Sequence, residues 1–146
     1  MNHEDTKARS FLRGNQGGNV AIPSELEKVA TLIVDSAFAV HKNLGAGLLE
    51  SVYEICFCHE LQKRGVNFER QVVLPIMYDG LLLDDALRLD VLVDNQIICE
   101  LKAVEEISPV HQAQMLTYLK LANKRLGFLI NFNVPLIKHG IKRMVL

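Results

Sequence analysis

The sequence has little of what secreted, membrane-spanning or disulfide-stabilised proteins depend on. Its 146 residues include three cysteines and no tryptophan. No apolar run approaches the ~20 residues of a membrane span, and the polar start MNHEDTKARS lacks the apolar segment of a secretory signal. We therefore expect a cytoplasmic protein without a membrane partner. Cys56, Cys58 and Cys99 are interpreted as reduced core thiols, because their number and spacing favour neither a disulfide framework nor a zinc site.

The chain also lacks the positive charge of a generic nucleic-acid binder, since its net charge is −1. The average conceals an asymmetry. Residues 24–106 carry 15 acids and 7 bases, whereas residues 107–146 carry six bases and no acid. A basic surface beside an acidic site would let a polyanion approach, but ordinary solvated faces explain the same pattern, and charge alone does not choose between them.

An apolar content of 49% is enough for one domain with a real core. Residues 1–22 are polar and glycine-dotted and are expected to form a mobile tail, with the domain at residues 23–146. Ser24-Glu25-Leu26-Glu27 predicts a capping box, and apolar residues then repeat at helical spacing up to Gly45. A second helix is predicted from about Gly47 to Arg64, ended by Gly65.

Strand patterns follow at residues 67–78, 81–93 and 97–104, with Asp79-Gly80 as the first turn. Ser108-Pro109 begins a helix that continues over residues 110–123 and closes near Gly127. Two more strands are predicted at residues 128–132 and 141–145. This order predicts an α/β fold, a mixed sheet flanked by helices.

The chemistry-bearing residues lie on two of these strands. Glu100 and Lys102 are two residues apart in an apolar segment, so both project from one face of a strand. Asp90 is an isolated acid on the preceding strand. Burying such charges costs several kcal/mol unless partners compensate, on the order of the penalties known for buried ions. Two carboxylates can bind a divalent cation, and an ammonium group can lie beside it. These are the groups that cleave a phosphodiester with a metal-activated water.

Whether the two acids meet depends on the loop between their strands. A two-residue turn would put them on opposite faces, whereas a three-residue loop, Asp94-Asn95-Gln96, pairs Val93 with Ile97 and sets Asp90 across from Glu100. A purely structural alternative stays open, in which Asp90 forms a buried ion pair with Arg88 or Lys102. Lys102 could assist the attacking water or serve only as a counter-ion.

Two helices offer further candidates. Glu50 stands at the start of the second helix, where a carboxylate also interacts favourably with the helix dipole. Gln114 and Tyr118 share one side of the later helix at a spacing of four, together with His111 and Met115. Such a stripe is usually packing, but its polar atoms could also position substrate or water.

At these residues the chain resembles the GxxExxY protein family, a group within the PD-(D/E)xK nuclease superfamily. The resemblance runs from about Ser24 to Leu146. It covers the name-giving motif Gly47-Leu48-Leu49-Glu50-Ser51-Val52-Tyr53, the acid strand Arg88-Leu89-Asp90, the strand Glu100-Leu101-Lys102, the spacing Gln114-x-x-x-Tyr118, and the ending Asn131-Phe132-Asn133 with Gly140-Ile141-Lys142-Arg143.

The resemblance implies a restriction-endonuclease-like core. Asp90 and Glu100 would bind Mg²⁺ or Mn²⁺ with the Leu101 carbonyl, and Glu50 would add an acid. Gln114 and Tyr118 resemble the Q-x-x-x-Y element of RecB-like and Cas4-like nucleases. We therefore expect a metal-dependent nuclease with Lys102 assisting the nucleophile.

The expected partner is nucleic acid, DNA rather than RNA, with a protein partner or a homodimer left open. The alternatives are a nuclease-fold module that binds nucleic acid or a protein without cutting, and a hydrolase of small phosphorylated molecules.

Overall fold

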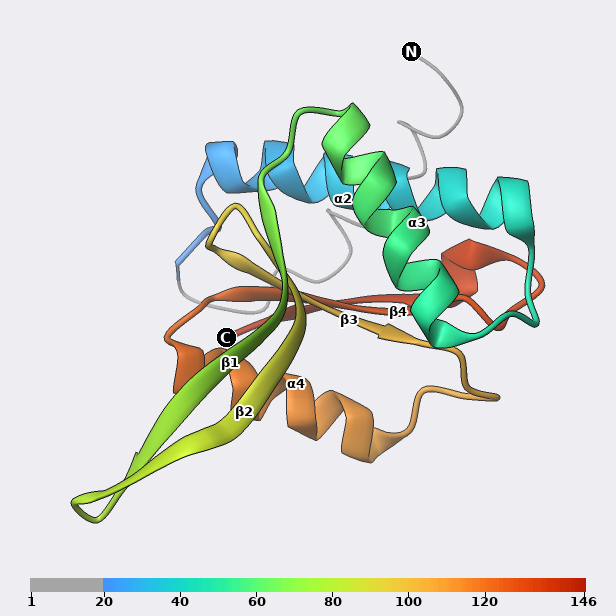
Figure 1. The fold of residues 1–146 in the computed structure, drawn as a ribbon. Coiled ribbons are helices and arrows are strands. Elements are labelled where there is room, and N and C mark those ends of the chain that lie inside the picture. Colours follow the sequence, from blue (N-terminus) through green and yellow to red (C-terminus); the bar gives the residue numbers. More distant parts are fainter. Residues whose placement is uncertain (1–19) are drawn as a thin grey trace.

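A five-stranded sheet with helices on both faces organises residues 20–146, the part of the chain that the computed structural model describes (Figure 1). The elements in chain order are α2 (Ser24–Leu44), α3 (Glu50–Lys63), β1 (Phe68–Tyr78), β2 (Leu81–Val93), β3 (Ile97–Lys102), α4 (Pro109–Ala122), β4 (Leu126–Asn131), the 3₁₀ helix η1 (Ile137–His139) and β5 (Ile141–Val145). The predicted α/β class is confirmed, and the predicted strands are found within about two residues of their expected ends.

The sheet is mixed. Its strand order is β1-β2-β3-β4-β5, with β3 and β4 parallel and every other neighbouring pair antiparallel. The parallel pair needs a crossover, and α4 supplies it. The first three strands form an antiparallel meander.

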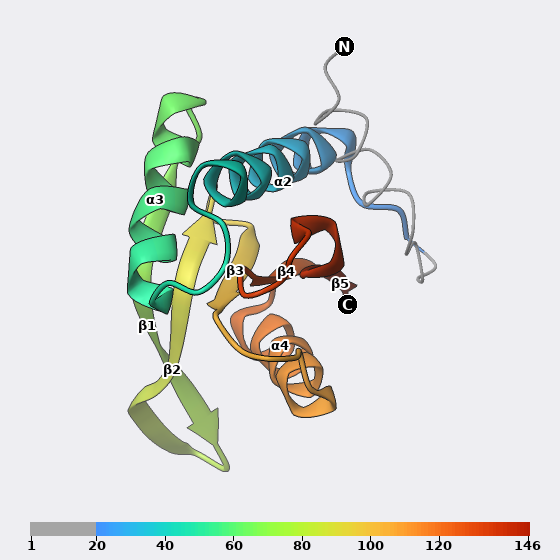
Figure 2. The same cartoon turned by 90° about the vertical axis from the view of Figure 1, so that its right-hand side faces the viewer.

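Two cores lie on the two faces of the sheet. In Figure 2, α2 and α3 cover one face and α4 covers the other. The larger core joins α2 and α3 to sheet residues such as Val91, Cys99 and Leu101. The smaller core joins Met115 of α4 to residues such as Leu89. Alternate residues of β3 enter alternate cores, as strand geometry requires.

The predicted capping box at Ser24 is wrong. Pro23, not Ser24, occupies the N-cap position, and its carbonyl accepts hydrogen bonds from the N–H groups of Leu26 and Glu27. Ser24 is already helical, and no side chain caps this end. The Glu27 carboxylate is also engaged elsewhere, because it binds both terminal nitrogens of the buried Arg143 in β5.

The predicted end of α4 also needs correction. Ser108 caps the start as expected, accepting from the His111 N–H at 3.3 Å. At the other end Asn123, with a φ of 55°, supplies the left-handed residue, not Gly127. Gly127 lies in β4 for a packing reason, since a Cβ there would lie 2.5 Å from the Met115 sulfur.

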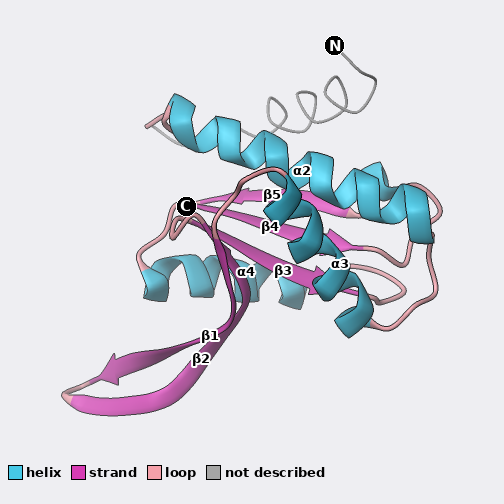
Figure 3. Ribbon diagram, turned by 45° about the horizontal axis from the view of Figure 1, so that its top comes forward, coloured by secondary structure: helices cyan, strands magenta, loops and turns pink. Residues whose placement is uncertain are grey.

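The β1–β2 hairpin leaves the sheet as a long arm (Figure 3). In a regular strand Leu87, Leu89, Val91 and Val93 would share one face. Here Leu87 and Leu89 pack in the α4 core, whereas Val91 and Val93 pack in the other core. The strand therefore changes sides at the residue between them, Asp90.

The partner strand shows the same kink. Gln71 lies between the paired positions Arg70–Val91 and Val72–Leu89, and its φ is +52°. A positive φ is uncommon for a side-chain-bearing residue and locally bends the strand. The kink of the arm is thus set by Gln71 and Asp90 together.

The predicted tail falls mostly outside the described residues. Of its last residues, Val20 and Ala21 offer their carbonyl oxygens to the Arg125 guanidinium, and Ile22 packs against the larger core. The three cysteines are free; Cys58 and Cys99 are buried, as the sequence predicts, whereas Cys56 is half-buried. Within residues 20–146 no helix is long and apolar enough to cross a membrane.

Candidate active site

The loop between β2 and β3 has the predicted length. Val93 pairs with Ile97, which leaves the three residues 94–96 as the connection. Asp94 and Asn95 take φ values of 52° and 55°, the left-handed conformation that Asp and Asn tolerate. The predicted meeting of Asp90 with Glu100 follows from this register.

The backbone pairing of β2 with β3 ends just before the two acids. Its last backbone pair is Val91 with Cys99, so the expected backbone pair of Asp90 with Glu100 is not formed. Instead the Asp90 carboxylate accepts from the Leu101 N–H at 2.9 Å, and the Asp90 N–H approaches Glu100 Oε2 at 3.4 Å. Side-chain bonds replace the ladder because each carboxylate needs donors that the opposite backbone offers.

Glu100 is the most perturbed group of the site. Its side chain is buried, with 3% of the residue exposed, and Oε1 has no hydrogen-bond partner. Burial, and then a hydrogen bond and charge repulsion from Asp90, raise the Glu100 pKa to about 10, although Lys102 lowers it. Without a cation, Glu100 is therefore protonated at neutral pH and hydrogen-bonds to the Asp90 side chain.

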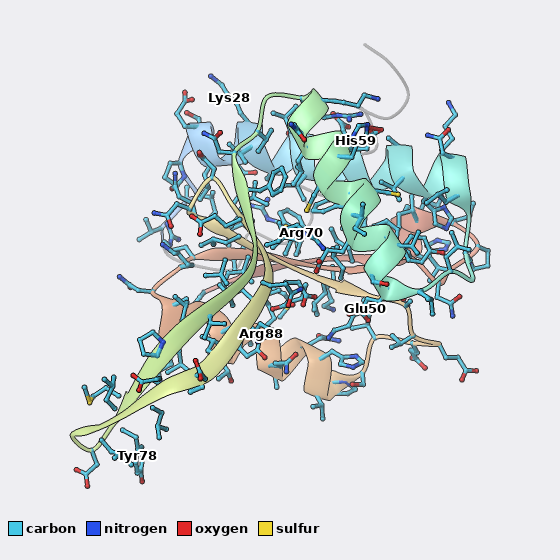
Figure 4. All side chains as sticks on the ribbon, in the orientation of Figure 1. Lys28, Glu50, His59, Arg70, Tyr78 and Arg88 are labelled. Atoms are coloured by element: carbon cyan, nitrogen blue, oxygen red, sulfur yellow. The ribbon has the colours of Figure 1, made fainter. Side chains whose placement is uncertain are left out.

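Glu50 and Lys102 belong to the same electrostatic cluster. Burial raises the Glu50 pKa, and the charge of Asp90 raises it further, whereas Lys102 and the Ala103 N–H act in the opposite direction. The three ribbon views agree that the start of α3 lies beside the end of β3, and Figure 4 shows Glu50 there. Within residues 20–146, the ion pair of Asp90 with Arg88 or Lys102 that the structural alternative requires is not formed, whereas Lys102 lowers the pKa of both Glu50 and Glu100.

The start of α3 is held by a tyrosine. Tyr53 is fully buried, and its hydroxyl donates to the Gly45 carbonyl at 2.7 Å and accepts from the Leu48 N–H at 3.0 Å. Gly47, between these partners, has a φ of 98° that only glycine adopts easily. The Gly47-x-x-Glu50-x-x-Tyr53 motif is therefore one structural unit that fixes where Glu50 projects.

On α4, Tyr118 faces the acid pair. Its side chain is half-buried, and burial, followed by the charges of Glu100 and Asp90, raises the pKa of its hydroxyl. Gln114 is half-buried one turn earlier and makes no hydrogen bond within the described residues. The structure therefore brings Glu50, Lys102 and Tyr118 to the acid pair, whereas the role of Gln114 stays a prediction.

Behind the site, α3 is tied to the kink of the arm. Glu54 is 7% exposed, and its carboxylate accepts from both Arg70 and Gln71. The Arg70 Nη2 lies 2.6 Å from Oε2, and the Gln71 amide lies 2.8 Å from Oε1. Unlike Glu100, this buried acid has every partner it needs.

A family model described as the PD-(D/E)XK nuclease superfamily matches residues 27–144. The chain belongs to the PD-(D/E)XK nuclease superfamily. The matched region holds all the acids described above together with Lys102. The solved structure described as "Crystal structure of SSO0001" is similar in fold, with a TM-score of 0.52 and 18% identity over 97% of this chain and 75% of that chain. No curated protein matches the chain.

Sequence reasoning noted the ending Asn131-Phe132-Asn133 but missed what its first residue does. Asn131, at the end of β4, is 1% exposed and binds both backbone groups of Val104: its oxygen accepts from the N–H at 3.1 Å, and its amide donates to the carbonyl at 2.9 Å. The next residue, Phe132, stacks on Tyr53 with ring centroids 4.6 Å apart. Asn131 and Phe132 thus join the chain leaving β3 to the start of α3.

The donor set fits a divalent cation of the kind PD-(D/E)XK nucleases use. Glu100 Oε1 is a buried oxygen without a partner beside a second carboxylate, and hard cations bind such oxygens. The Leu101 carbonyl lies on the same strand edge as its N–H, which contacts Asp90. Within residues 20–146 no group of three His, Cys, Asp or Glu side chains could hold one ion, so Glu50 as a ligand stays a prediction.

Proposed function

We propose that this protein is a nuclease that hydrolyses phosphodiester bonds in nucleic acid, with Mg²⁺ or Mn²⁺ held by Asp90, Glu100 and the Leu101 carbonyl. The observation that carries the proposal is the buried, unpartnered Oε1 of Glu100. A protein that had no cation to bind would lose little by replacing this carboxyl with an apolar or amide side chain. Membership of a nuclease superfamily supports the same conclusion.

A bound cation would make water a stronger nucleophile and stabilise charge on the phosphate. The chain's own groups act around it. Lys102 lies beside the acids and helps to deprotonate the attacking water or offsets charge on the phosphate. Tyr118 and Gln114 orient substrate or water from α4, and Glu50 extends the acid cluster from α3.

The substrate class follows from charge as well as from the family. Among the bases of residues 107–146, Lys138 and Lys142 form no ion pair within the described residues and can attract phosphates, whereas Arg143 is buried against Glu27. We propose DNA rather than RNA as the polymer.

We also propose that the chain is one domain over residues 23–146 within the GxxExxY group. The hydrogen bonds of the Tyr53 hydroxyl support this grouping, because through them the tyrosine of the motif holds the backbone before Glu50. Action in the cytoplasm stays a prediction.

The test is a panel of labelled single- and double-stranded DNA and RNA, incubated with Mg²⁺ or Mn²⁺. We expect cleavage that chelation abolishes and that Asp90→Ala, Glu100→Ala and Lys102→Ala each remove. Asp94→Ala is the matched control, because it changes an acid of the same hairpin outside the cluster. Unchanged cleavage in the three site variants would refute the proposal. Binding without cleavage by the wild type would favour the non-cutting module instead.

A further inference from the structure

The outer end of the β1–β2 arm is apolar and exposed. We call Met77, Tyr78, Leu81, Leu82 and Leu83 the arm tip; these residues are 63%, 71%, 58%, 54% and 41% exposed. Figures 1 and 3 show the tip standing clear of every other described element, and Figure 4 shows Tyr78 at its outer end. An isolated two-stranded ribbon is marginally stable in water, and a contiguous apolar patch marks a binding surface.

The charges around the arm tip disfavour nucleic acid as its partner. Residues 75–87 contain three acids, Asp79, Asp84 and Asp85, and no base. In the described part of the chain none of the three forms an ion pair. A phosphate backbone would be repelled here. Two arm tips would also repel each other, so tip-to-tip pairing of two copies is disfavoured for the same reason.

A surface of opposite charge lies on the same chain. The solvent side of α4 exposes Leu116 and Leu121, 38% and 44%, next to Lys120, and Lys124 follows the C-cap residue Asn123. We call these four residues the basic face of α4. Among residues 20–146 neither lysine forms an ion pair, and no acid occurs after residue 106. Apolar side chains beside unpaired lysines match the apolar, acidic arm tip.

We propose that the arm tip of one copy docks on the basic face of α4 of a second copy, and that the second arm docks reciprocally. Such a dimer has two-fold symmetry and uses each contact twice, which helps it reach the ~1,200 Å² that specific interfaces bury in total. Leu116 and Lys120 lie one turn apart on the side of α4 away from Tyr118, whereas Leu121 is one turn from Tyr118. The docked arm therefore borders the candidate active site. Self-association is measured without substrate, so its test is independent of cleavage.

Charge reversal tests the pairing. Sedimentation velocity of the full chain, from low micromolar to submillimolar concentration, should show a wild-type dimer. Asp84→Lys with Asp85→Lys, and separately Lys120→Glu with Lys124→Glu, should each weaken self-association about 10-fold or more. An equimolar mixture of these two variants should form a dimer again, because both of its contacts then join opposite charges. Thermal unfolding of each variant confirms that it is folded.

An apolar substitution tests the other half of the contact. Leu82→Ser should weaken the dimer, whereas Ile55→Ser, a change at a residue 57% exposed on α3, should leave it intact. A wild-type monomer at every concentration would overturn the proposal. A dimer that survives either charge reversal, or a mixture that stays monomeric, would overturn it as well.

Discussion

Replacing Glu100 by glutamine should stabilise the protein in the absence of metal. Glutamine keeps the shape of the side chain and removes an ionisable group that burial disfavours. Its amide can still donate to Asp90, as the protonated carboxyl does. Oε1 of Glu100 has no hydrogen-bond partner, so the substitution removes no hydrogen bond at that position.

The size of the effect follows from the pKa. The Glu100 pKa rises from 4.5 to about 10 on folding, so at pH 7 the unfolded chain is ionised at this residue while the folded protein stays protonated. Each pH unit between the unfolded pKa and the working pH costs about 1.4 kcal/mol, which makes the penalty ~3 kcal/mol at pH 7. For a domain of this size the glutamine variant should melt roughly 6–12 °C higher.

The pH dependence has a definite sign. Because the folded pKa lies above the unfolded value, the folded state binds the proton more tightly. The stability from this group is therefore fully present below pH ~4.5 and is lost as the pH rises towards ~10. The difference in unfolding free energy between variant and wild type should be near zero at pH 4.5 and grow with pH.

The assay is thermal and urea unfolding with a chelator, at several pH values, and again with Mn²⁺. Mn²⁺ should raise the melting temperature of the wild type, because a cation can replace the proton of Glu100, and should have little effect on Glu100→Gln. The matched control is Glu54→Gln. This acid is equally buried but bonded to Arg70 and Gln71, so the same substitution should destabilise the fold.

Two results would refute this reasoning. One is a Glu100→Gln variant that is less stable than the wild type at pH 7 while Glu54→Gln behaves as expected. The other is a stability difference that does not change with pH, which would mean that Glu100 titrates normally in the folded state.

Three smaller predictions follow from the packing around the site. Tyr53→Phe should cost about 1–3 kcal/mol of stability, measured by urea unfolding, since two backbone groups lose a buried partner. Asn131→Asp removes the donor to the Val104 carbonyl and should reduce the Mn²⁺-induced rise in melting temperature more than it reduces metal-free stability; an equal loss in both would contradict a positioning role. Gly127→Ala should destabilise by about 1–3 kcal/mol, because its Cβ would collide with Met115, and an unchanged melting temperature would disprove the close contact.

The elements of the fold were largely predictable because their signals are local. The Asp79-Gly80 turn, for example, forms with φ values of 49° and 79°, as its residue types indicate. The kink at Asp90 was not predictable. An apolar pattern over residues 87–93 is compatible with either face of the sheet, and tertiary packing decides which core each residue enters.

The candidate site divides in the same way. Asp90 and Glu100 could be paired from the parity of a three-residue loop, since strand geometry fixes faces. Asn131 could not be linked to Val104, because its bonds join positions 27 residues apart and no periodic pattern marks them. The signal that could have indicated a role is its place as the one polar side chain that ends the apolar strand β4.

Asp90 occupies the joint of the arm, where β2 passes from one core to the other opposite the positive φ of Gln71. The same change of sides that carries Leu89 into one core and Val91 into the other also directs the Asp90 carboxylate to the Leu101 N–H. The position of one acid of the pair is therefore set by the path of the arm, and the position of the other by β3.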